Sequence, residues 1–244
     1  MTMKTSHTSA APLDFSLAEH GRPANGSSEP TSLDRRLFFQ LLVLTGCTDT
    51  APLQKALTAR GIEAVLYKDV HDPRGVGLLT FAEDPAFFTE TVRPLVNEGP
   101  FAALRLDRSY SMFGRTYSIG YEADLESTLI HRPRSRVLDP TYPWAVWYPL
   151  RRSGAFEQLD ADTRRAALME HGSIGRRFGE AGHAQDIRLD CHVLDAADND
   201  FVIGLVGPKL HPLSALVQAM RQTVQTSQFV ERMGPFFVGH AVRP

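Results

Sequence analysis

The stretch LFFQLLVLTGCTDTAPLQKALTARGIEAVLYKDVHDPRGVGLLTFAED, from Leu37 to Asp84, decides the fold of this protein. It begins with an apolar run typical of a buried strand and continues into a segment with helical spacing that ends at Gly61. Two further strands follow, joined by the turn DPRG. The chain then gives a helix in which Pro94 marks a kink or an early end, and returns to extended structure. The segments are 37–46, 49–61, 62–70, 76–84, 84–99 and 101–115.

The same order of elements recurs after a long connector at about residues 116–143. The second set comprises a strand at 144–150, a helix at 160–178, strands at 186–194 and 200–207, a helix at 212–230 and a strand at 235–242. Strand, helix, strand, strand, helix, strand is the ferredoxin-like pattern. The sequence therefore predicts an α+β fold in which two tandem ferredoxin-like halves form one subunit of the dimeric α+β barrel type. The predicted division is an N-terminal arm (1–35), a first half (36–130) and a second half (131–244).

Composition narrows the class of protein. The 244 residues are 43% hydrophobic and 22% charged, with a net charge of -2, which gives no electrostatic footprint for nucleic acid. No run approaches the roughly 18 apolar residues of a membrane span. The arm lacks the apolar stretch of a secretory signal and is rich in small and polar residues, so we expect it to be disordered or loosely docked. The two distant cysteines, Cys47 and Cys191, indicate buried thiols and a reduced, cytoplasmic setting.

His171 is the most informative candidate in the second half. It lies in RRAALMEHGSIGRRF (164–178), on the same helical face as Ala167, Ile174 and Phe178. An imidazole on an apolar face binds either a hydrogen-bond partner or a metal. Taken alone, a core histidine bonded to a backbone carbonyl is the more common case. Gly172 beside it would leave room for a flat, bulky group.

Three other side chains have two interpretations each. Tyr148, in WYPLRR, is either a packed aromatic or a phenol that relays an electron and a proton near a redox centre. Arg188 shares a strand face with Asp190 and either pairs with it or stabilises an oxyanion in a cavity. Arg221 is an exposed helix charge unless something anionic lies beside it. The chain has no GxGxxG, P-loop, HExxH or GxSxG motif, and its histidines have no zinc spacing.

Several motifs of the second half resemble the chlorite dismutase superfamily, with its coproheme decarboxylase branch the most similar. They are YPL (148–150), TRRAALMEHGSIGRRF (163–178), DNDFVIGL (198–205), AMR (219–221) and GPFFVG (234–239). The resemblance covers most of residues 143–244; over residues 36–130 it is limited to the order of elements. It implies two ferredoxin-like halves, a homo-oligomer (often a pentamer), and an iron porphyrin, heme b or coproheme, in the C-terminal half.

The resemblance also implies roles for individual residues. His171 matches the axial iron ligand, and Tyr148 matches the tyrosine oxidised to a radical in coproheme decarboxylases. Arg152 stands where that branch has a lysine, and Arg221 matches an arginine near the porphyrin propionates. The distal position falls on Arg188 when counted back from Phe201, whereas counting forward from His171 gives Gln185 as its rival. Some relatives support the ligand histidine with a glutamate, for which Gln225 is the nearest candidate here.

The resemblance predicts a heme-dependent oxidoreductase. Its leading reaction is the peroxide-driven decarboxylation of coproheme III to heme b, with Tyr148 as the radical relay. The alternatives are a chlorite dismutase or peroxidase-like enzyme acting on a small oxidant, favoured by Arg188, and a heme-binding protein without turnover. The expected partners are hydrogen peroxide or chlorite, with neither nucleic acid nor a membrane span.

Overall fold

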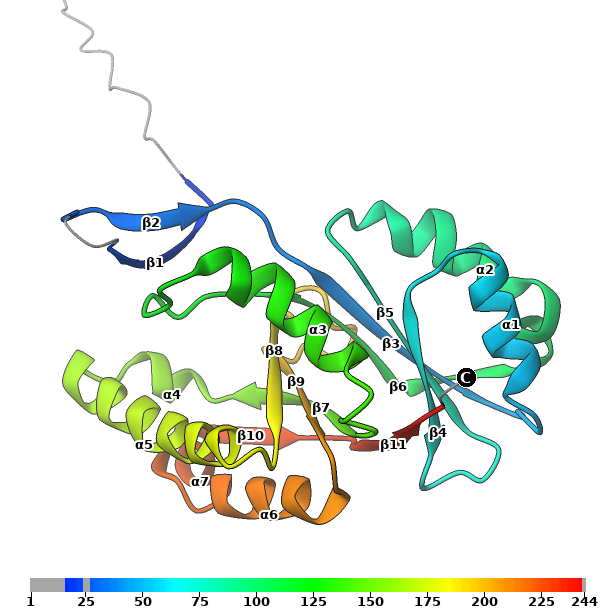
Figure 1. The fold of residues 1–244 in the computed structure, drawn as a ribbon. Helices are drawn as coiled ribbons and strands as arrows, with labels where there is room; N and C mark the ends of the chain where they lie inside the picture. Colours follow the sequence, from blue (N-terminus) through cyan, green and yellow to red (C-terminus); the bar gives the residue numbers. More distant parts are fainter. Residues whose placement is uncertain (1–15, 24–26, 243–244) are drawn as a thin grey trace, which may run out of the picture.

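The computed structural model describes residues 16–23 and 27–242 (Figure 1). The first half consists of four strands and their connecting helices. In chain order these are β3 (Phe38–Thr45), α1 (Ala51–Ala59), β4 (Ala64–Asp69), β5 (Val76–Ala82), the π-helical turn η1 (Phe88–Val92), α2 (Arg93–Asn97), the 3₁₀ turn η2 (Gly99–Ala103) and β6 (Arg105–Thr116). Pro94 lies in the first turn of α2, where its missing N–H is tolerated, so the helix changes from π to α there and neither ends nor breaks.

The second half repeats this plan with longer helices. Its elements are β7 (Trp144–Arg152), α4 (Gly154–Glu157), α5 (Ala161–Glu180), β8 (Gln185–Asp190), β9 (Phe201–Gly207), α6 (Leu210–Met220), α7 (Val224–Phe229), β10 (Val230–Met233) and β11 (Phe237–Ala241). The predicted helix 160–178 is therefore confirmed as α5, whose first turn is capped by Asp160 accepting the Thr163 N–H.

The strands of both halves join into a closed antiparallel barrel. Each half has the ferredoxin-like strand order, β4-β5-β3-β6 in the first and β8-β9-β7-β11 in the second. The halves pair with each other at two places, β6 with β8 and β4 with β11. Strand β10 pairs with the end of β7 beyond β11. The predicted α+β fold of two ferredoxin-like halves is confirmed.

Closing the sheet creates one shared interior and two outer faces. The interior is filled by large apolar side chains from both halves, among them Phe39, Tyr67, Trp147 and Phe237. Outside the barrel, α1 and α2 cover the first half, and α5 and α6 cover the second (Figure 1). The interior therefore binds the halves together, while each outer face belongs to one half.

Three segments differ from the sequence-based expectation. The connector 116–143 contains the π-helical turn η3 (Ser127–His131) and α3 (Arg132–Leu138), which run across the predicted boundary at 130/131. The helix predicted at 212–230 is two helices, because Thr223 caps a new helix and Val230 enters β10. The strand predicted at 186–194 ends at Asp190, since the chain turns at Cys191 and Val193 has a φ of 66°.

Part of the expected N-terminal arm has regular structure. Strands β1 (Glu19–Pro23) and β2 (Pro30–Leu33) form a separate two-stranded sheet, the N-terminal hairpin. Glu19 is tied to β6 through Arg115, whose Nη1 lies 2.9 Å from Glu19 Oε1. The rest of the arm, residues 1–15 and 24–26, lies outside the described residues. Both cysteines are buried and free, as predicted.

Candidate functional site

The outer face of the second half carries most of the candidate residues. Tyr148 on β7 and Arg188 on β8 both pair with Ile203 on β9, so these three residues form one row across adjacent strands. Directly opposed residues point to the same side of a sheet. Tyr148 packs with the outer apolar cluster, which places the whole row on the side covered by α5 and α6. Arg188 and Tyr148 therefore share one wall.

This wall is less completely covered than the interior of the barrel. Its apolar side chains from β9, β11, α5 and the segment around β10 stay partly exposed. They include Ile174, Phe178, Phe201, Ile203, Met233, Phe236 and Val238. The protein therefore leaves an apolar surface beside the charged and titratable groups described next.

His171 on α5 is held by threonine hydroxyls from the start of α7. Its Nδ1 lies 3.3 Å from Thr223 Oγ1 and 3.5 Å from Thr226 Oγ1. Thr223 Oγ1 can donate its proton to the Met220 carbonyl at 2.8 Å, and this arrangement favours the tautomer in which His171 donates from Nδ1. Burial lowers the pKa of His171, which keeps the ring neutral. The lone pair of Nε2 is then free to bind a metal.

The partner of His171 differs from both sequence-based interpretations. It is not a backbone carbonyl, and it is not Gln225, whose Oε1 is buried without a hydrogen-bond partner. The reason is the break between α6 and α7, which turns Thr223 and Thr226 toward α5 and Gln225 elsewhere. Sequence reasoning missed both threonines because it placed them inside one continuous helix.

Tyr148 lies on the wall with its ring against Phe236, at 4.8 Å between ring centroids. It is 5% exposed, and burial raises its pKa well above the ordinary value although Arg221 opposes the shift. The phenol therefore keeps its proton at any physiological pH. Arg221 also lies near this ring pair, with its Cζ 5.9 Å from the Phe236 centroid.

Arg188 is surrounded by acidic and aromatic groups. Its Nε lies 3.3 Å from Asp186 Oδ2, its Nη2 lies 3.9 Å from Glu122 Oε1, and its Cζ lies 5.9 Å from the Tyr117 ring centroid. Burial opposes its charge, but Asp186, Tyr117 and Glu122 raise the pKa of Arg188 overall. The guanidinium is a permanent cation. Neither Tyr117 nor Glu122 is predicted from the sequence, because both lie in the connector and no motif marks them.

The two remaining candidates lie in different environments. Arg152 is held between the rings of Phe156 and Phe201, at 4.3 and 4.7 Å from their centroids, and its buried Nε has no partner. It follows Tyr148 and Leu150 on the same face of β7. Gln185 pairs with Val206 and therefore lies on the opposite face, with its Nε2 bonded to the Gly179 carbonyl at 3.4 Å. The structure brings Arg188, and not Gln185, onto the wall with Tyr148.

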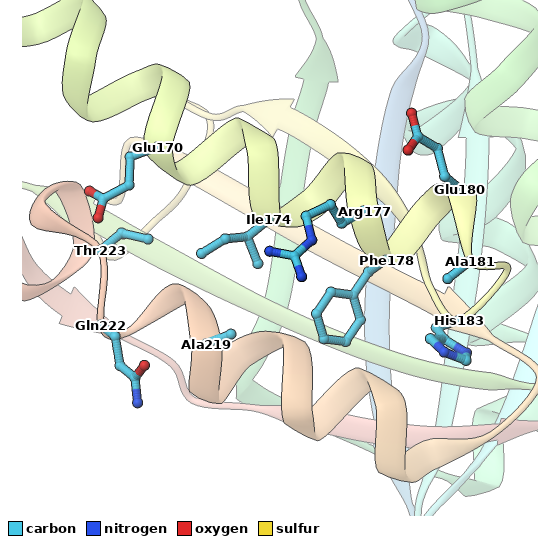
Figure 2. Close-up of a pocket in the computed structure, with 10 residues that line it drawn as sticks. All are labelled: Glu170, Ile174, Arg177, Phe178, Glu180, Ala181, His183, Ala219, Gln222 and Thr223. Carbon is cyan, nitrogen blue, oxygen red and sulfur yellow. The ribbon is translucent and has the colours of Figure 1, made fainter.

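A groove of about 920 Å³ runs between α5 and α6 (Figure 2). Ile174, Phe178 and Ala219 form its apolar part, and Glu170 and Thr223 lie at one end. His171, Tyr148 and Arg188 do not line it. Of the two threonines that contact His171, only Thr223 lines the groove, and it lies on the Nδ1 side of the imidazole.

Two kinds of feature are absent from the described part of the chain. Among residues 16–23 and 27–242, no three His, Cys, Asp or Glu side chains converge as a metal site. None of the helices in these ranges is both long and apolar enough to cross a membrane.

One family model matches this chain, and similar solved structures share its fold. The family described as chlorite dismutase matches residues 81–242. A point mutant of chlorite dismutase from Candidatus Nitrospira defluvii is similar in structure, with 14% identity, a TM-score of 0.65, and coverage of 86% of this chain and 93% of that chain. A heme-binding protein from Thermus thermophilus gives 19% identity, a TM-score of 0.65, and coverage of 86% and 92%.

A third similar structure is the Nitrospira chlorite dismutase in complex with imidazole, at 13% identity and a TM-score of 0.63, covering 86% of this chain and 93% of that chain. No curated protein sequence matches this chain. At these identities the structural neighbours establish the fold, and the family match covers about two thirds of the sequence. The chain belongs to the chlorite dismutase family.

Proposed function

We propose that this protein is a heme-dependent oxidoreductase in which His171 binds the iron through Nε2. The observation that carries the proposal is the environment of that imidazole. Its Nδ1 faces the hydroxyl of Thr223, burial lowers its pKa, and its helix packs on the half whose outer wall holds Tyr148 and Arg188. The partly exposed apolar surface fits a large, flat, apolar group. An iron porphyrin bound there would supply the activation of a peroxide or an oxychlorine anion.

In this proposal each side chain on or near the wall has a role of its own. Arg188 attracts an anionic oxidant and stabilises the oxygen anion that leaves it, because its charge is permanent. Tyr148 would lose an electron and a proton together to the oxidant that peroxide generates at the iron, since its raised pKa keeps the phenol neutral until then. Arg221 and Arg152 bind propionates, for which the unpartnered buried Nε of Arg152 supplies a spare donor.

Our leading specific reaction is the peroxide-driven decarboxylation of coproheme III to heme b. Support comes from the motifs around Tyr148, His171 and the strand FFVG, which resemble the decarboxylase branch. The arginines near Phe236 and Phe201 add support, because coproheme carries more propionates than heme b. Arg152 in place of a lysine is the departure from that branch.

A second candidate is a chlorite dismutase or peroxidase-like reaction on a small oxidant. Arg188 favours it, since an arginine on the row of Tyr148 presents a cation where an oxyanion would bind. A heme-binding protein without turnover is the third. The family relationship is compatible with all three.

The first experiment is a titration of the purified protein with coproheme and, separately, with hemin, read in the Soret band. We expect saturable binding that His171→Ala loses or shifts, with coproheme bound more tightly. His71→Ala is the matched control, because His71 is exposed in the turn after β4, in the first half of the molecule. Identical spectra for wild type and His171→Ala would contradict the proposal.

Two further variants separate the candidate reactions. Tyr148→Phe should abolish decarboxylation by peroxide and spare turnover of chlorite or peroxide, whereas Arg188→Ala should do the reverse. If neither variant alters any turnover that His171→Ala removes, both roles are wrong. Absence of turnover in a heme-loaded wild type would leave the binding protein as the answer.

The assembly and location of the protein stay predictions. We expect a homo-oligomer, with a pentamer as the leading state, in the cytoplasm. Sedimentation velocity of the full chain at several concentrations tests the first, and fractionation of the source cells tests the second.

A further inference from the structure

Glu122 is a buried carboxylate in a tight turn that follows β6, the last strand of the first half. Its side chain is 9% exposed. Its oxygens accept the backbone N–H groups of Ile119 and Tyr121 at 2.9–3.1 Å. A carboxylate held by three such contacts has little freedom to turn. It therefore presents Oε1 at a fixed position, 3.9 Å from Nη2 of Arg188.

The other acidic neighbour of Arg188 is shared. Asp186 lies on the same strand, but Arg136 also binds it, with Nη1 at 3.2 Å from Oδ1 and 2.6 Å from the backbone carbonyl. Among the described residues, Glu122 pairs with no cation other than Arg188. Glu122 is thus the acidic group that belongs to Arg188 alone, and it comes from the other half of the molecule.

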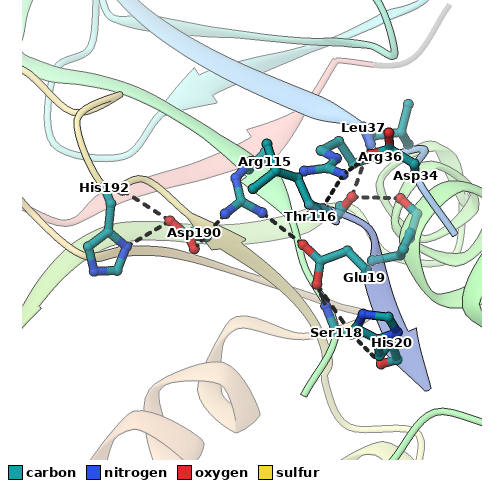
Figure 3. Close-up of polar contacts among 12 residues, drawn as sticks. Glu19, His20, Asp34, Arg36, Leu37, Arg115, Thr116, Ser118, Asp190 and His192 are labelled. Atoms are coloured by element: carbon teal, nitrogen blue, oxygen red, sulfur yellow. Dashed lines mark hydrogen bonds and ion pairs between the residues drawn. The ribbon is translucent and has the colours of Figure 1, made fainter. Parts of the chain in front are cut away.

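The N-terminal hairpin fixes the backbone of Glu122. The N–H of Arg22 donates to the Glu122 carbonyl at 3.0 Å. Gly21 allows this approach, because a Cβ there would lie 2.5 Å from the same oxygen. Glu19 of β1 holds the start of the turn, accepting from Arg115 at 2.9 Å and from the Ser118 N–H at 3.0 Å (Figure 3). The hairpin precedes residues 81–242, the part of the chain that the family match covers.

We propose that Glu122 is a positioning residue for Arg188, fixed by the N-terminal hairpin, and that it competes with small anions for that guanidinium. The competition with an anionic oxidant rests on the proposed function, whereas the contact between Glu122 and Arg188 does not. The hairpin then influences Arg188, on the outer face of the second half, through the turn that contains Glu122 and follows the last strand of the first half.

The test is the rate at which phenylglyoxal modifies Arg188, read by peptide mass spectrometry on the full chain. This reagent attacks the neutral guanidine, so a paired carboxylate slows it. Glu122→Gln should speed modification of Arg188 by about three- to tenfold, the effect of roughly half to one pKa unit. Glu126→Gln is the matched control, since Glu126 is exposed and pairs with Arg35, away from Arg188.

Arg152 on the same face serves as an internal reference for local unfolding. If Glu122→Gln speeds Arg188 alone, the proposal stands; an unchanged rate at Arg188, or an equal increase at Arg152, overturns it. Glu122→Asp, which shortens the carboxylate, should give an intermediate rate. Gly21→Ala, which displaces the turn, should act in the same direction as Glu122→Gln.

The same samples separate this inference from the proposed function. Hemin added to wild type should give a Soret shift and should protect Arg188 from the reagent. No Soret shift would remove the proposed function while the rates measured without hemin still decide the role of Glu122.

Discussion

The two halves have the same strand order, but the apolar side chains on their outer faces are buried to different extents. On the first half, α1 and α2 cover a cluster of ten buried residues with six partly buried hydrophobic residues packed against it, whereas the cluster of the second half has seven buried and twelve partly buried residues. On the second half, α5 takes the place of α1 but has 20 residues against 9. It contacts α6, α7 and β8, and the apolar wall stays partly exposed. Because the fold is the same, the exposed apolar surface of the second half is not required by the fold itself and suits a binding role.

The charged residues follow the same division. Apolar side chains, most of them buried, cover the first face, whereas the second half carries Arg152, Arg188 and His171, whose pKa is lowered by burial. Perturbed titratable groups beside an open apolar surface are typical of a binding site. Comparing the halves thus favours the second half as the one that carries the binding site, without reference to any relative.

The largest expected effect concerns matched positions on the third strand of each half. Leu78→Ala on β5 should lower the free energy of unfolding by about 3 kcal/mol, because its side chain is fully buried. Ile203→Ala on β9 should cost about 1 kcal/mol, because that side chain is partly exposed. Denaturant unfolding measures both. Equal losses would show that the two faces are packed alike.

Substitutions at two glycines compare the packing inside the barrel with the packing on the outer helix α5 of the second half. A Cβ on Gly204 would lie 2.5 Å from the Trp147 ring, so Gly204→Ala should cost about 2 kcal/mol or more. A Cβ on Gly172 would meet nothing within 4 Å, and Gly172→Ala should stabilise α5 by about 0.5–1 kcal/mol. Thermal unfolding of both variants checks the signs. A destabilised Gly172→Ala protein would mean that α5 is more tightly packed there than described.

Thr223 connects helix capping to the imidazole. Thr223→Val removes the cap of α7 at a cost of about 1 kcal/mol, and it also removes the nearer of the two hydroxyls at the Nδ1 of His171, leaving Thr226 Oγ1 at 3.5 Å. Ser153→Ala removes the cap of α4 at a similar cost without touching His171. NMR of the imidazole nitrogens should show a changed tautomer ratio in the first variant only. An unchanged ratio would exclude Thr223 as the group that selects the tautomer.

The smallest effect is the pH dependence contributed by His171. Because burial lowers its pKa in the folded state, the unfolded chain takes up this proton at a higher pH. Its contribution to stability is complete above about pH 7 and is lost as the pH falls from about 6.5 toward the lower folded-state value. His171→Gln should therefore lose less stability than wild type between about pH 7.5 and pH 5.5. Parallel losses would mean that His171 titrates normally.

Local patterns predicted most of the fold. Helix α5 followed from apolar spacing and from the capping Asp160, and alternation placed Arg188 and Asp190 on one strand face. The segment containing α3 was missed, although Leu125, Leu129, Pro133 and Val137 recur at four-residue intervals and are all buried. Its prolines and arginines obscured that signal.

The candidate site was harder to predict because its contacts join distant segments. The row of Tyr148, Ile203 and Arg188 depends on the register of three strands, which no local pattern fixes. Thr223 reaches His171 only because α6 ends at Met220. Glu122 reaches Arg188 only because the barrel closes between β6 and β8.

That closure has a consequence for how the molecule opens. Strands β6 and β8 share two residue pairs, Arg115 with Asp190 and Thr116 with Leu189, whereas β3 pairs with β5 along its length. Local opening starts where few contacts must be broken. Amide hydrogens at this junction should therefore exchange with solvent well before those of β3 and β5. Solvent would then enter between β6 and β8, within two residues of Arg188. Among the described residues, this is the pairing between the halves that the N-terminal hairpin contacts, through Glu19 and Arg115.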